Sequence, residues 1–379
     1  MLGWINRNAN LVEGTALGST PARMLRKRTP QSAMPYILDR AGRLATARFA
    51  VGVEILPYEL VAVVTDPIGV MLAWRRWPVP EMDVETVVKR ISAAARELVS
   101  TSLGYELPDS HVGLGLQIGG PVDAHKRIVL SYCNNPTDAA YREHPYQWER
   151  PTPLADLVQE ETGCRTVVEN DAAAYAVYEQ RFGVGRQAKS FAVILVRDGI
   201  GGGVVLEEQL APIPFEVGHI RVSINGRRCD CGNFGCIEAY AGRRAILGIV
   251  SELMGGKAVI ENIENIVELS KRDDKAEEVL QAFHEGGTMV ARGVATVLTM
   301  FGVNQVVIFG PPAMIDRIGN PTAQAFLRGL ERFPEMTYPI FRDCSLITRA
   351  LGRTDGAHGA ALVALNQFFF VPVSNPEQR

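Results

Sequence analysis

Three of the six cysteines stand within eight residues, and this cluster constrains the fold more than any other feature of the chain. Cys229, Cys231 and Cys236 lie in the segment RRCDCGNFGC. A disulfide between the first two would close a strained ring, and the opening segment MLGWINRNANLVEG lacks the apolar core of a secretory signal. Clustered cysteines outside the secretory route more often bind a metal than form disulfides.

A fourth metal ligand, His219, stands ten residues before the first of these cysteines. One imidazole and three thiolates are the usual ligands of a closed, tetrahedral structural zinc, which we therefore expect here. Gly232 and Gly235 would let the loop fold back around the ion. Because protein ligands fill all four positions, the ion would not activate water but would hold Glu216 and Glu238 in place. The alternative is a set of buried cysteines near an unrelated histidine.

The composition is that of a chain that folds unaided. At 379 residues with 47% hydrophobic residues, it is long enough for two domains with buried cores. The net charge of −3 gives no general case for binding nucleic acid or an anionic membrane. No apolar run approaches the roughly 18–20 residues that span a bilayer, so a soluble cytoplasmic protein without membrane contact is expected.

The N-terminal segment differs from the rest of the chain in charge. Residues 1–48 hold eight arginines and lysines against two acids, with Gly, Pro, Ser and Thr among them and no sustained hydrophobic period. We expect residues 1–47 to form a basic, poorly ordered arm. Such an arm can contact the phosphate backbone of DNA without reading its sequence, or it can be a solvated tail.

From Phe49 onward the chain passes through one order of elements twice. The first cycle has strands at 49–56, 59–65 and 69–77, a helix at 83–103 capped by Asp83, a strand entering a glycine-rich turn at 111–123, a helix at 153–163, a strand at 165–171 and a helix at 171–183. The second cycle has a strand, glycine-rich turn and strand at 190–208, helices at 237–254 and 275–301, and a buried strand at 305–310.

Two similar α/β halves, each opening with a glycine-turn hairpin, imply two lobes with a ligand cleft between them. The first lobe is expected at 48–185 and is completed by a C-terminal helix at 357–370. The second lobe is expected at 186–356 and contains the zinc loop, 219–236.

Four segments together resemble one family of sugar-binding proteins. FEVGH, CDCGNFGCIE, VVENDAAAYAVYE and DGIGGGVV look like the ROK family of repressors, open reading frames and kinases acting on sugars, over about residues 49–370. The resemblance implies an α/β, actin-like (ribonuclease H-like), two-lobed sugar-kinase fold with an inter-lobe cleft. The residues that it implies for the sugar site are Asn170, Asp171, Glu216, His219 and Glu238, with Asn135 as a weaker additional contact.

The chemistry of this set suits a sugar, because carboxylates and an amide grip hydroxyl groups in fixed directions. The resemblance puts Asp171 in the catalytic-base position, where it would accept the proton of the attacking hydroxyl during phosphoryl transfer. Each residue also has a simpler reading. Asp171 can be the N-cap of the helix that follows, Glu238 a first-turn helix acid and Glu216 a surface acid.

The first of the turns that hold ATP phosphates in the family's kinases is altered. Those kinases have Asp, then Gly-Gly and Thr or Ser in the first hairpin, whereas this chain has Glu54, Leu56, Pro57 and Tyr58 there. Side chains would fill the space that the phosphate needs, and a proline has no N–H to offer.

Two further departures fall on the nucleotide side. The second turn has Arg197 and Asp198 where kinases have Gly-Thr, and the adenosine region has Pro311 and Pro312. A carboxylate near phosphate is repulsive, and Arg197 could offset part of that repulsion. The glycines that remain at the degenerate phosphate and nucleotide positions are Gly199, Gly201, Gly202, Gly203 and Gly310.

A complete sugar set beside altered nucleotide turns favours a sugar-responsive transcriptional regulator or sensor. The family's regulators carry an N-terminal winged helix-turn-helix, and residues 1–47 show none. Contact with DNA would therefore go through the basic arm or a partner. The resemblance suggests a homodimer, and the ligand is expected to be a sugar or sugar phosphate that the sequence does not identify.

An active sugar kinase, of the glucokinase or N-acetylhexosamine kinase type with ATP, Mg²⁺ and Asp171 as base, is the alternative. A purely structural assembly protein is the least favoured reading, because it would not need the amide and carboxylates of the sugar set together.

Overall fold

The computed structural model describes most of the chain from residue 48 onward. The described residues are 48–104, 106–109, 111–130, 148, 151–255, 263–271 and 276–369, with the backbone of 37–38 and 44–45. The chain forms two compact units, 1–45 and 46–379. In the first, β1 (Ile37–Leu38) pairs antiparallel with β2 (Leu44–Ala45). The remainder of the expected basic arm, and the additional sugar contact Asn135, lie outside the described residues.

The first sheet of the larger unit has five strands in the order β5-β4-β3-β6-β9. Their bounds are β3 (Phe49–Leu56), β4 (Glu59–Thr65), β5 (Met71–Pro78), β6 (Val112–Ile118) and β9 (Thr166–Asn170). The first three form the expected antiparallel meander, and β6 and β9 extend it in parallel. Because side chains alternate across a strand, β3 sends Val51 and Val53 toward one helical layer and Ala50 toward another.

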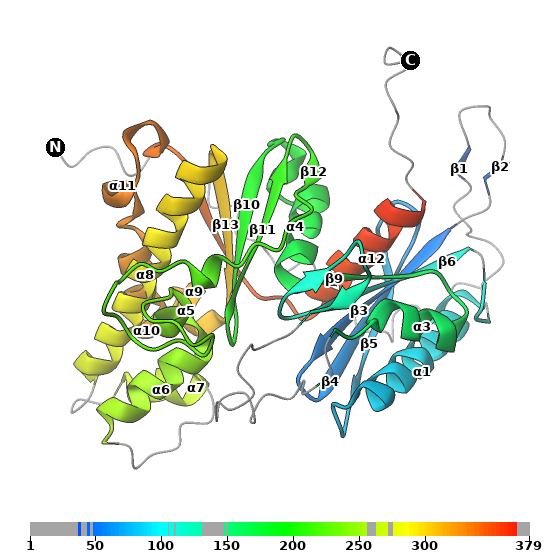
Figure 1. Cartoon of the computed structure of the whole chain (residues 1–379), viewed down its shortest axis with the longest axis horizontal. Helices are drawn as coiled ribbons and strands as arrows, with labels where there is room; N and C mark the ends of the chain where they lie inside the picture. Colours follow the sequence, from blue (N-terminus) through cyan, green and yellow to red (C-terminus); the bar gives the residue numbers. More distant parts are fainter. Residues whose placement is uncertain are drawn as a thin grey trace. The chain divides into compact units, whose positions relative to one another are not determined.

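Helices cover both faces of this sheet (Figure 1). One face carries α1 (Val84–Leu103) and α3 (Leu154–Thr162), and the other carries α12 (Asp355–Phe368). The expected cap of α1 is confirmed, because the Asp83 carboxylate accepts from the backbone N–H of Thr86 at 2.9 Å. A sheet buried on both faces explains why β3 and β4 are nearly continuous apolar runs.

The second sheet repeats the plan in the order β12-β11-β10-β13-β14. Its strands are β10 (Phe191–Val196), β11 (Ile200–Leu206), β12 (Gln209–Leu210), β13 (Gln305–Gly310) and β14 (Ser345–Ala350). One face packs on α4 (Asp171–Phe182) through Tyr175 and Ala176. The opposite face packs on a large helical layer that includes α8 (Ala276–Phe301).

The two covering helices, α4 and α12, also pack against each other. Gly359 of α12 lies so close to α4 that a Cβ atom there would fall 2.3 Å from the carbonyl oxygen of Ala174. The helix α4, which the sequence analysis places in the first lobe, thus joins the second sheet to the helix that covers the first. The start of α4 therefore belongs to a helix that contacts the layers of both sheets.

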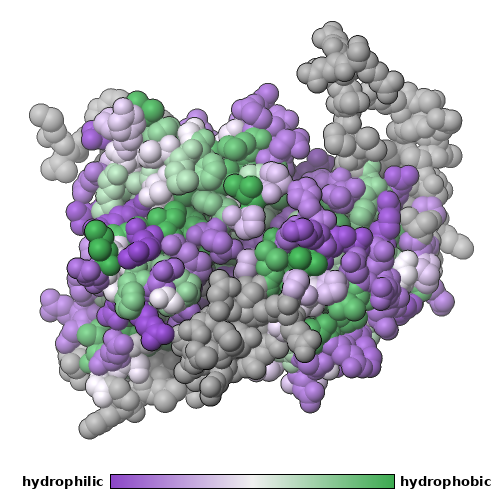
Figure 2. Space-filling view, in the orientation of Figure 1, coloured by the Kyte–Doolittle hydropathy of each residue, from purple (hydrophilic) through white to green (hydrophobic). Residues whose placement is uncertain are grey.

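The remaining elements lie mostly around the second sheet. They are β7 (Val122–Asp123), β8 (Ile128–Val129), η2 (Val184–Arg186), η3 (Val217–His219), α5 (Glu238–Ala241), α6 (Arg243–Leu253), α7 (Ile263–Leu269), α9 (Pro312–Ile315), α10 (Pro321–Leu330), α11 (Phe333–Met336) and η4 (Pro339–Phe341). Among the described residues, no helix is long and apolar enough to cross a membrane. On the face shown in Figure 2, hydrophilic residues surround smaller groups of hydrophobic ones.

The single helix expected at 237–254 is wrong, because the chain breaks it at Gly242. This residue has extended backbone angles, and its N–H still bonds to the carbonyl of Glu238. A Cβ atom on Gly242 would lie 2.8 Å from the carbonyl oxygen of Asp198. The break brings the start of α6 onto the second glycine turn, where the N–H of Arg243 donates to the carbonyl of Arg197 at 2.7 Å.

Candidate functional site

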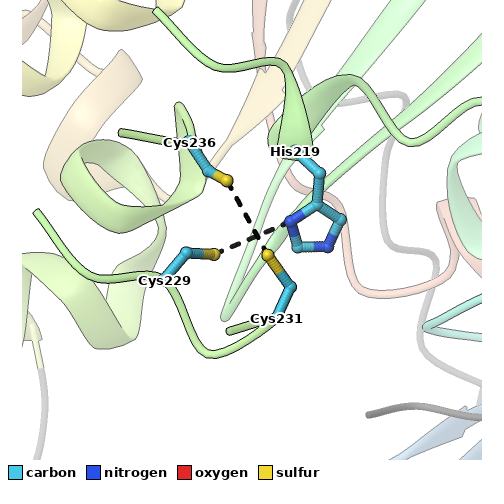
Figure 3. Close-up of side chains that lie close together, drawn as sticks. All are labelled: His219, Cys229, Cys231 and Cys236. Carbon is cyan, nitrogen blue, oxygen red and sulfur yellow. Dashed lines mark hydrogen bonds between the residues drawn. The ribbon is translucent and has the colours of Figure 1, made fainter. Parts of the chain in front are cut away.

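The four expected metal ligands meet in one cluster (Figure 3). Their ligand atoms all lie within 4.8 Å of one another. The Sγ of Cys229 is 3.7 Å from Nδ1 of His219, and the Sγ atoms of Cys231 and Cys236 are 3.7 Å apart. A tetrahedral ion with bonds of about 2.0–2.3 Å separates its ligands by roughly 3.6–3.8 Å. The four residues therefore fit a metal ion.

The loop that carries the cysteines depends on two glycines with left-handed backbone angles. Gly232 has φ 89° and Gly235 has φ 76°. A Cβ atom on Gly235 would lie 1.7 Å from the carbonyl oxygen of Ser223, so a side chain is excluded there. Burial raises the pKa of Cys236 to about 11 in the metal-free protein. A bound cation would displace such protons, because the thiolate is the ligand.

His219 presents its two ring nitrogens to different surroundings. Nδ1 faces the cysteines, and Nε2 points away from them (Figure 3). The two roles expected of this residue, metal ligand and sugar contact, are therefore compatible in geometry, because each uses its own nitrogen.

Asn170, and not Asp171, is the N-cap of α4. The Asn170 Oδ1 accepts from the N–H groups of Ala172 at 2.9 Å and Ala173 at 3.3 Å. Its Nδ2 donates to the carbonyl of Gly120 at 2.8 Å, which leaves one amide hydrogen for a ligand. Asp171 occupies the first helical position instead, so the simpler reading of Asp171 as the cap is wrong.

Asp171 is buried, with 9% of its surface exposed. Burial raises the pKa of this carboxyl to about 6, and the nearby positive charge of Arg197 works against that rise. Its Oδ1 also accepts from the N–H of Ala172 at 2.8 Å. A carboxyl with a pKa near neutrality is suited to accept a proton.

The two glutamates of the sugar set differ in exposure. Glu216 is exposed just before η3, whereas Glu238 is partly buried at the start of α5. Burial raises the pKa of Glu238, and His219 opposes that rise. The Glu238 Oε2 accepts from the N–H of Ile200 at 2.7 Å. Glu238 thus joins the metal loop to the second glycine turn.

The first turn of the nucleotide side offers no N–H to a phosphate. Pro57 has none, and the N–H of Tyr58 is directed at Sδ of Met82 at 3.3 Å. Tyr58 has φ 60°, an unusual value for a residue with a side chain, and 58% of its surface is exposed.

The second turn is bridged to the first sheet by an ion pair. Arg197 donates to Oε1 of Glu54 at 2.5 Å and to the hydroxyl of Tyr175 at 3.2 Å. The Glu54 side chain is 1% exposed and the Arg197 side chain 22%. The charge of Arg197 is therefore largely balanced by a carboxylate of the protein itself. Burial opposes charge on Arg197, but Tyr175, Glu54 and Asp171 outweigh this and raise its pKa.

Asp198, the other substituted residue of this turn, is also paired. Its Oδ1 lies 2.5 Å from the guanidinium of Arg243, at the start of α6. The glycines beside it are packed against the protein itself. A Cβ atom would fall 2.4 Å from Glu238 at Gly199, 2.5 Å from Phe215 at Gly202 and 2.7 Å from the carbonyl of Ala172 at Gly203.

Close packing within the protein also explains the glycines at 201 and 310. A Cβ atom on Gly201 would lie 3.0 Å from that of Ala172 and 3.5 Å from Oδ1 of Asp171. On Gly310, the last residue of β13, it would lie 2.8 Å from the Ile315 side chain. These glycines thus have packing reasons that hold without a nucleotide.

Sequence reasoning placed Glu54 in the altered first turn but did not predict its pairing with Arg197, and it did not name Tyr175. One sequence feature could have indicated that Glu54 needs a partner, because it is a charged residue within the apolar strand FAVGVEIL. Its neighbour in β6, Gln117, is fully buried, and neither of its side-chain polar atoms has a hydrogen-bond partner among the described residues. In the sequence Tyr175 is typical of an aromatic core residue, and no sequence feature indicates its contact with Arg197.

A cavity of about 1010 Å³ opens beside the sugar set and includes Asn170 and Glu216 in its lining. Residues from β9 and α12 of the first sheet's layers, and from the segment after β12 of the second sheet, contribute to its walls. The expectation of a ligand cleft between two α/β layers thus has a counterpart among the described residues.

Comparison with known proteins identifies the family. The ROK family model matches residues 50–367. The chain belongs to the ROK family. The ROK hexokinase of Thermus thermophilus is similar in structure, with a TM-score of 0.67 and 25% identity over 84% of this chain and 98% of the hexokinase. The actin-like sugar-kinase fold expected from the sequence is therefore confirmed.

Relatives of this ROK protein include both regulators and kinases. The xylose repressor of Caldicellulosiruptor bescii is 27% identical over 57% of this chain, and the glucokinase of Streptomyces coelicolor is 31% identical over 52%. The aligned part spans 51% of the repressor and 57% of the glucokinase, about half the length of each. Overall sequence similarity does not distinguish a regulator from a kinase. The residues of the site have to make that distinction.

Proposed function

We propose that this ROK protein binds a sugar between its lobes and acts as a sugar-responsive regulator or sensor that does not phosphorylate its ligand. The observation that carries the proposal is the ion pair between Arg197 and Glu54. It joins the two turns that the kinases of the family use for ATP phosphates, and it puts the protein's own charges there.

The energetics of this pair argue against nucleotide binding. A phosphate entering the turn would have to draw Arg197 from Glu54, whose side chain is 1% exposed. Separating a buried pair leaves an uncompensated charge and costs about 3–5 kcal/mol. A loss of that size weakens binding by roughly two to four orders of magnitude.

The sugar side keeps its donors and acceptors. Asn170 uses one of its two amide hydrogens on Gly120, and Glu216 lies near enough to Asp171 and Glu238 for their charges to interact, which supports this reading. We infer that the metal is zinc, held by His219 and the three cysteines. With four protein ligands it would supply a rigid loop and no open coordination position.

Signalling would follow from the position of α4. A ligand that bonds Asn170 and Asp171 acts on the first turn of the helix that packs on both α12 and the second sheet. Sugar binding would then favour one arrangement of the lobes, and a partner or DNA that binds the other arrangement would be released. The basic arm at 1–47 or a partner protein would make the contact with DNA, and the protein would act as a homodimer.

A sugar kinase is the second candidate, and Asp171 favours it. This buried carboxyl has a pKa of about 6 and lies beside the glycine turn, as a catalytic base would. For this candidate to hold, ATP with Mg²⁺ would have to bind despite the charges of Arg197, Glu54 and Asp198.

Two assays on the full chain decide between the candidates. Thermal shifts are measured with a panel of pentoses, hexoses and N-acetylhexosamines, and ADP release is then measured with each sugar and Mg²⁺–ATP, using Asp171→Asn as the blank. The proposal expects at least one sugar to raise the melting temperature and none to support ADP release above the blank. Saturable, Asp171-dependent phosphorylation of any sugar would replace the sensor with a kinase.

A further inference from the structure

The cavity beside the sugar set is larger than one sugar unit requires. At about 1010 Å³ it lies at the upper end of the roughly 300–1,000 Å³ typical of small-molecule pockets. Asn170 and Glu216 form part of its lining, while Asp171, His219 and Glu238 do not. Most of the cavity therefore lies beyond the place where the five expected sugar contacts gather.

One side of α4 forms the length of this cavity. Asn170, Ala173, Val177 and Gln180 follow each other at intervals of three or four residues and all line it. Residues at that spacing share a helix face. At 1.5 Å per residue, the ten steps from Asn170 to Gln180 give a groove about 15 Å long.

The walls of the groove combine apolar side chains with about as much polar surface. The segment from 211 to 216 contributes Pro212 and Pro214, which have no N–H, and the ring of Phe215. The last part of α12 contributes Val363 and Phe368. The apolar and aromatic side chains suit the C–H faces of sugar rings, and the polar side chains between them can bond hydroxyl groups.

The charges in the cavity disfavour an anionic ligand. Among the described residues that line it, both arginines are engaged: Arg127 pairs with Asp156 at 3.0 Å, and Arg181 donates to the carbonyl of Ile68 at 3.1 Å. Carboxylates of Glu169 and Glu216 line the same space. A phosphate would be repelled by these carboxylates, whereas neutral hydroxyls can donate to them.

We propose that this groove is a saccharide subsite that continues from the sugar set, and that the ligand is a neutral oligosaccharide or glycoside rather than a monosaccharide or sugar phosphate. The inference rests on the proposed sugar binding and adds the class of ligand. One unit would meet Asn170 and Glu216, and the next units would lie along Ala173 and Val177 toward α12.

The test compares one-unit and two-unit saccharides by calorimetry on the full chain. The probes are D-glucose and D-xylose against maltose, cellobiose and xylobiose, with glucose 6-phosphate as the anionic probe. We expect at least one disaccharide to bind tenfold or more tightly than its monosaccharide, and the phosphate to bind more weakly than glucose.

A pair of variants locates the effect. Val363→Trp fills the distal groove, and Val84→Trp makes the same change at another partly buried helix position, outside the cavity. Val363→Trp should weaken the disaccharide at least tenfold and the monosaccharide less than twofold, and Val84→Trp should change neither. Far-ultraviolet circular dichroism and the monosaccharide affinity report whether each variant is folded.

The outcomes separate this inference from the proposed function. Equal affinity for one and two units, or a disaccharide affinity that Val363→Trp leaves unchanged, would overturn the subsite while sugar binding stands. Absence of binding by every neutral saccharide, including the monosaccharides, would overturn both.

Discussion

The sugar side and the nucleotide side of this ROK protein both carry charged groups, but these groups differ in whether they are paired with other residues of the protein. On the sugar side, Glu216 is an exposed residue and Asn170 uses only one of its two amide hydrogens within the described part of the chain. On the nucleotide side, Arg197 and Asp198 are both closed on partners from the protein. Polar groups without a protein partner can bond a ligand, whereas groups that already bond one another leave no bonds for a ligand to make.

The metal loop supports the sugar side, so removing a metal ligand should have the largest effect on stability and on sugar binding. Cys231→Ser removes one of four ligands, and we expect loss of stoichiometric zinc, a lower melting temperature and no detectable sugar binding, because Glu238 and His219 are held by this loop. Metal content, calorimetric melting and sugar titration check this.

Cys344→Ser is the matched control, since Cys344 is a partly buried free cysteine outside the cluster. It should keep the metal and the sugar affinity. Full zinc content in Cys231→Ser would show that the cluster is not the ligand set.

The ion pair between Arg197 and Glu54 on the nucleotide side can be removed by mutation. Arg197→Ala leaves the carboxylate of Glu54 buried without its partner, and we expect a loss of about 3 kcal/mol in the free energy of unfolding. The double variant Arg197→Met with Glu54→Leu should recover most of this, because apolar residues can replace a buried pair. Urea unfolding measures both.

Arg243→Ala is the control on the same turn, because its pair with Asp198 is partly exposed. It should cost only about 0–1 kcal/mol. If Arg197→Ala costs no more than this control, the buried pair does not organise the nucleotide side.

The pH dependence of stability tests the burial of Asp171. Since its folded pKa of about 6 is above the ordinary 3.8, the folded state binds the proton more tightly, and stability falls as pH rises between these values. Asp171→Asn should therefore stabilise the protein by up to about 3 kcal/mol at pH 7–8 and by nothing near pH 3. Parallel unfolding curves at all pH values would contradict the burial.

The smallest expected effect comes from variants of Asn170, which distinguish its role as the cap of α4 from its role as a sugar contact. Asn170→Ala removes the cap of α4 and should cost about 1 kcal/mol, whereas Asn170→Asp keeps a capping oxygen and should be nearly neutral for stability. Both variants lose the amide and should bind sugar more weakly. Unchanged sugar affinity in Asn170→Asp would limit this residue to capping.

Local patterns made the fold largely predictable from the sequence. The strands 49–56 and 59–65 were predicted to the residue, because both are long apolar runs with a clear turn between them. The strand β14 was missed, because it lies at the sheet edge, where SLITRA is half exposed and mixes polar with apolar residues. The break at Gly242 was missed because the contact that requires it, with Asp198, is distant in sequence.

The same distinction holds for the site. The four metal ligands fall in a short segment whose spacing is visible, so their cluster could be predicted, whereas the sugar residues were named through the family resemblance and stay a prediction. The pair between Arg197 and Glu54 joins positions 143 residues apart, and only the fold shows that they meet. The altered turns were evident from the sequence, but their internal neutralisation was not.

Calorimetric titration of Mg²⁺–ATP into the full, metal-loaded protein tests the central claim most directly, with the Thermus thermophilus ROK hexokinase under the same conditions as the positive control. The account predicts saturable heat for the hexokinase and none for this chain, with or without a bound sugar. Saturable binding in the micromolar to low millimolar range would contradict it, because ATP would then have displaced Arg197 from Glu54.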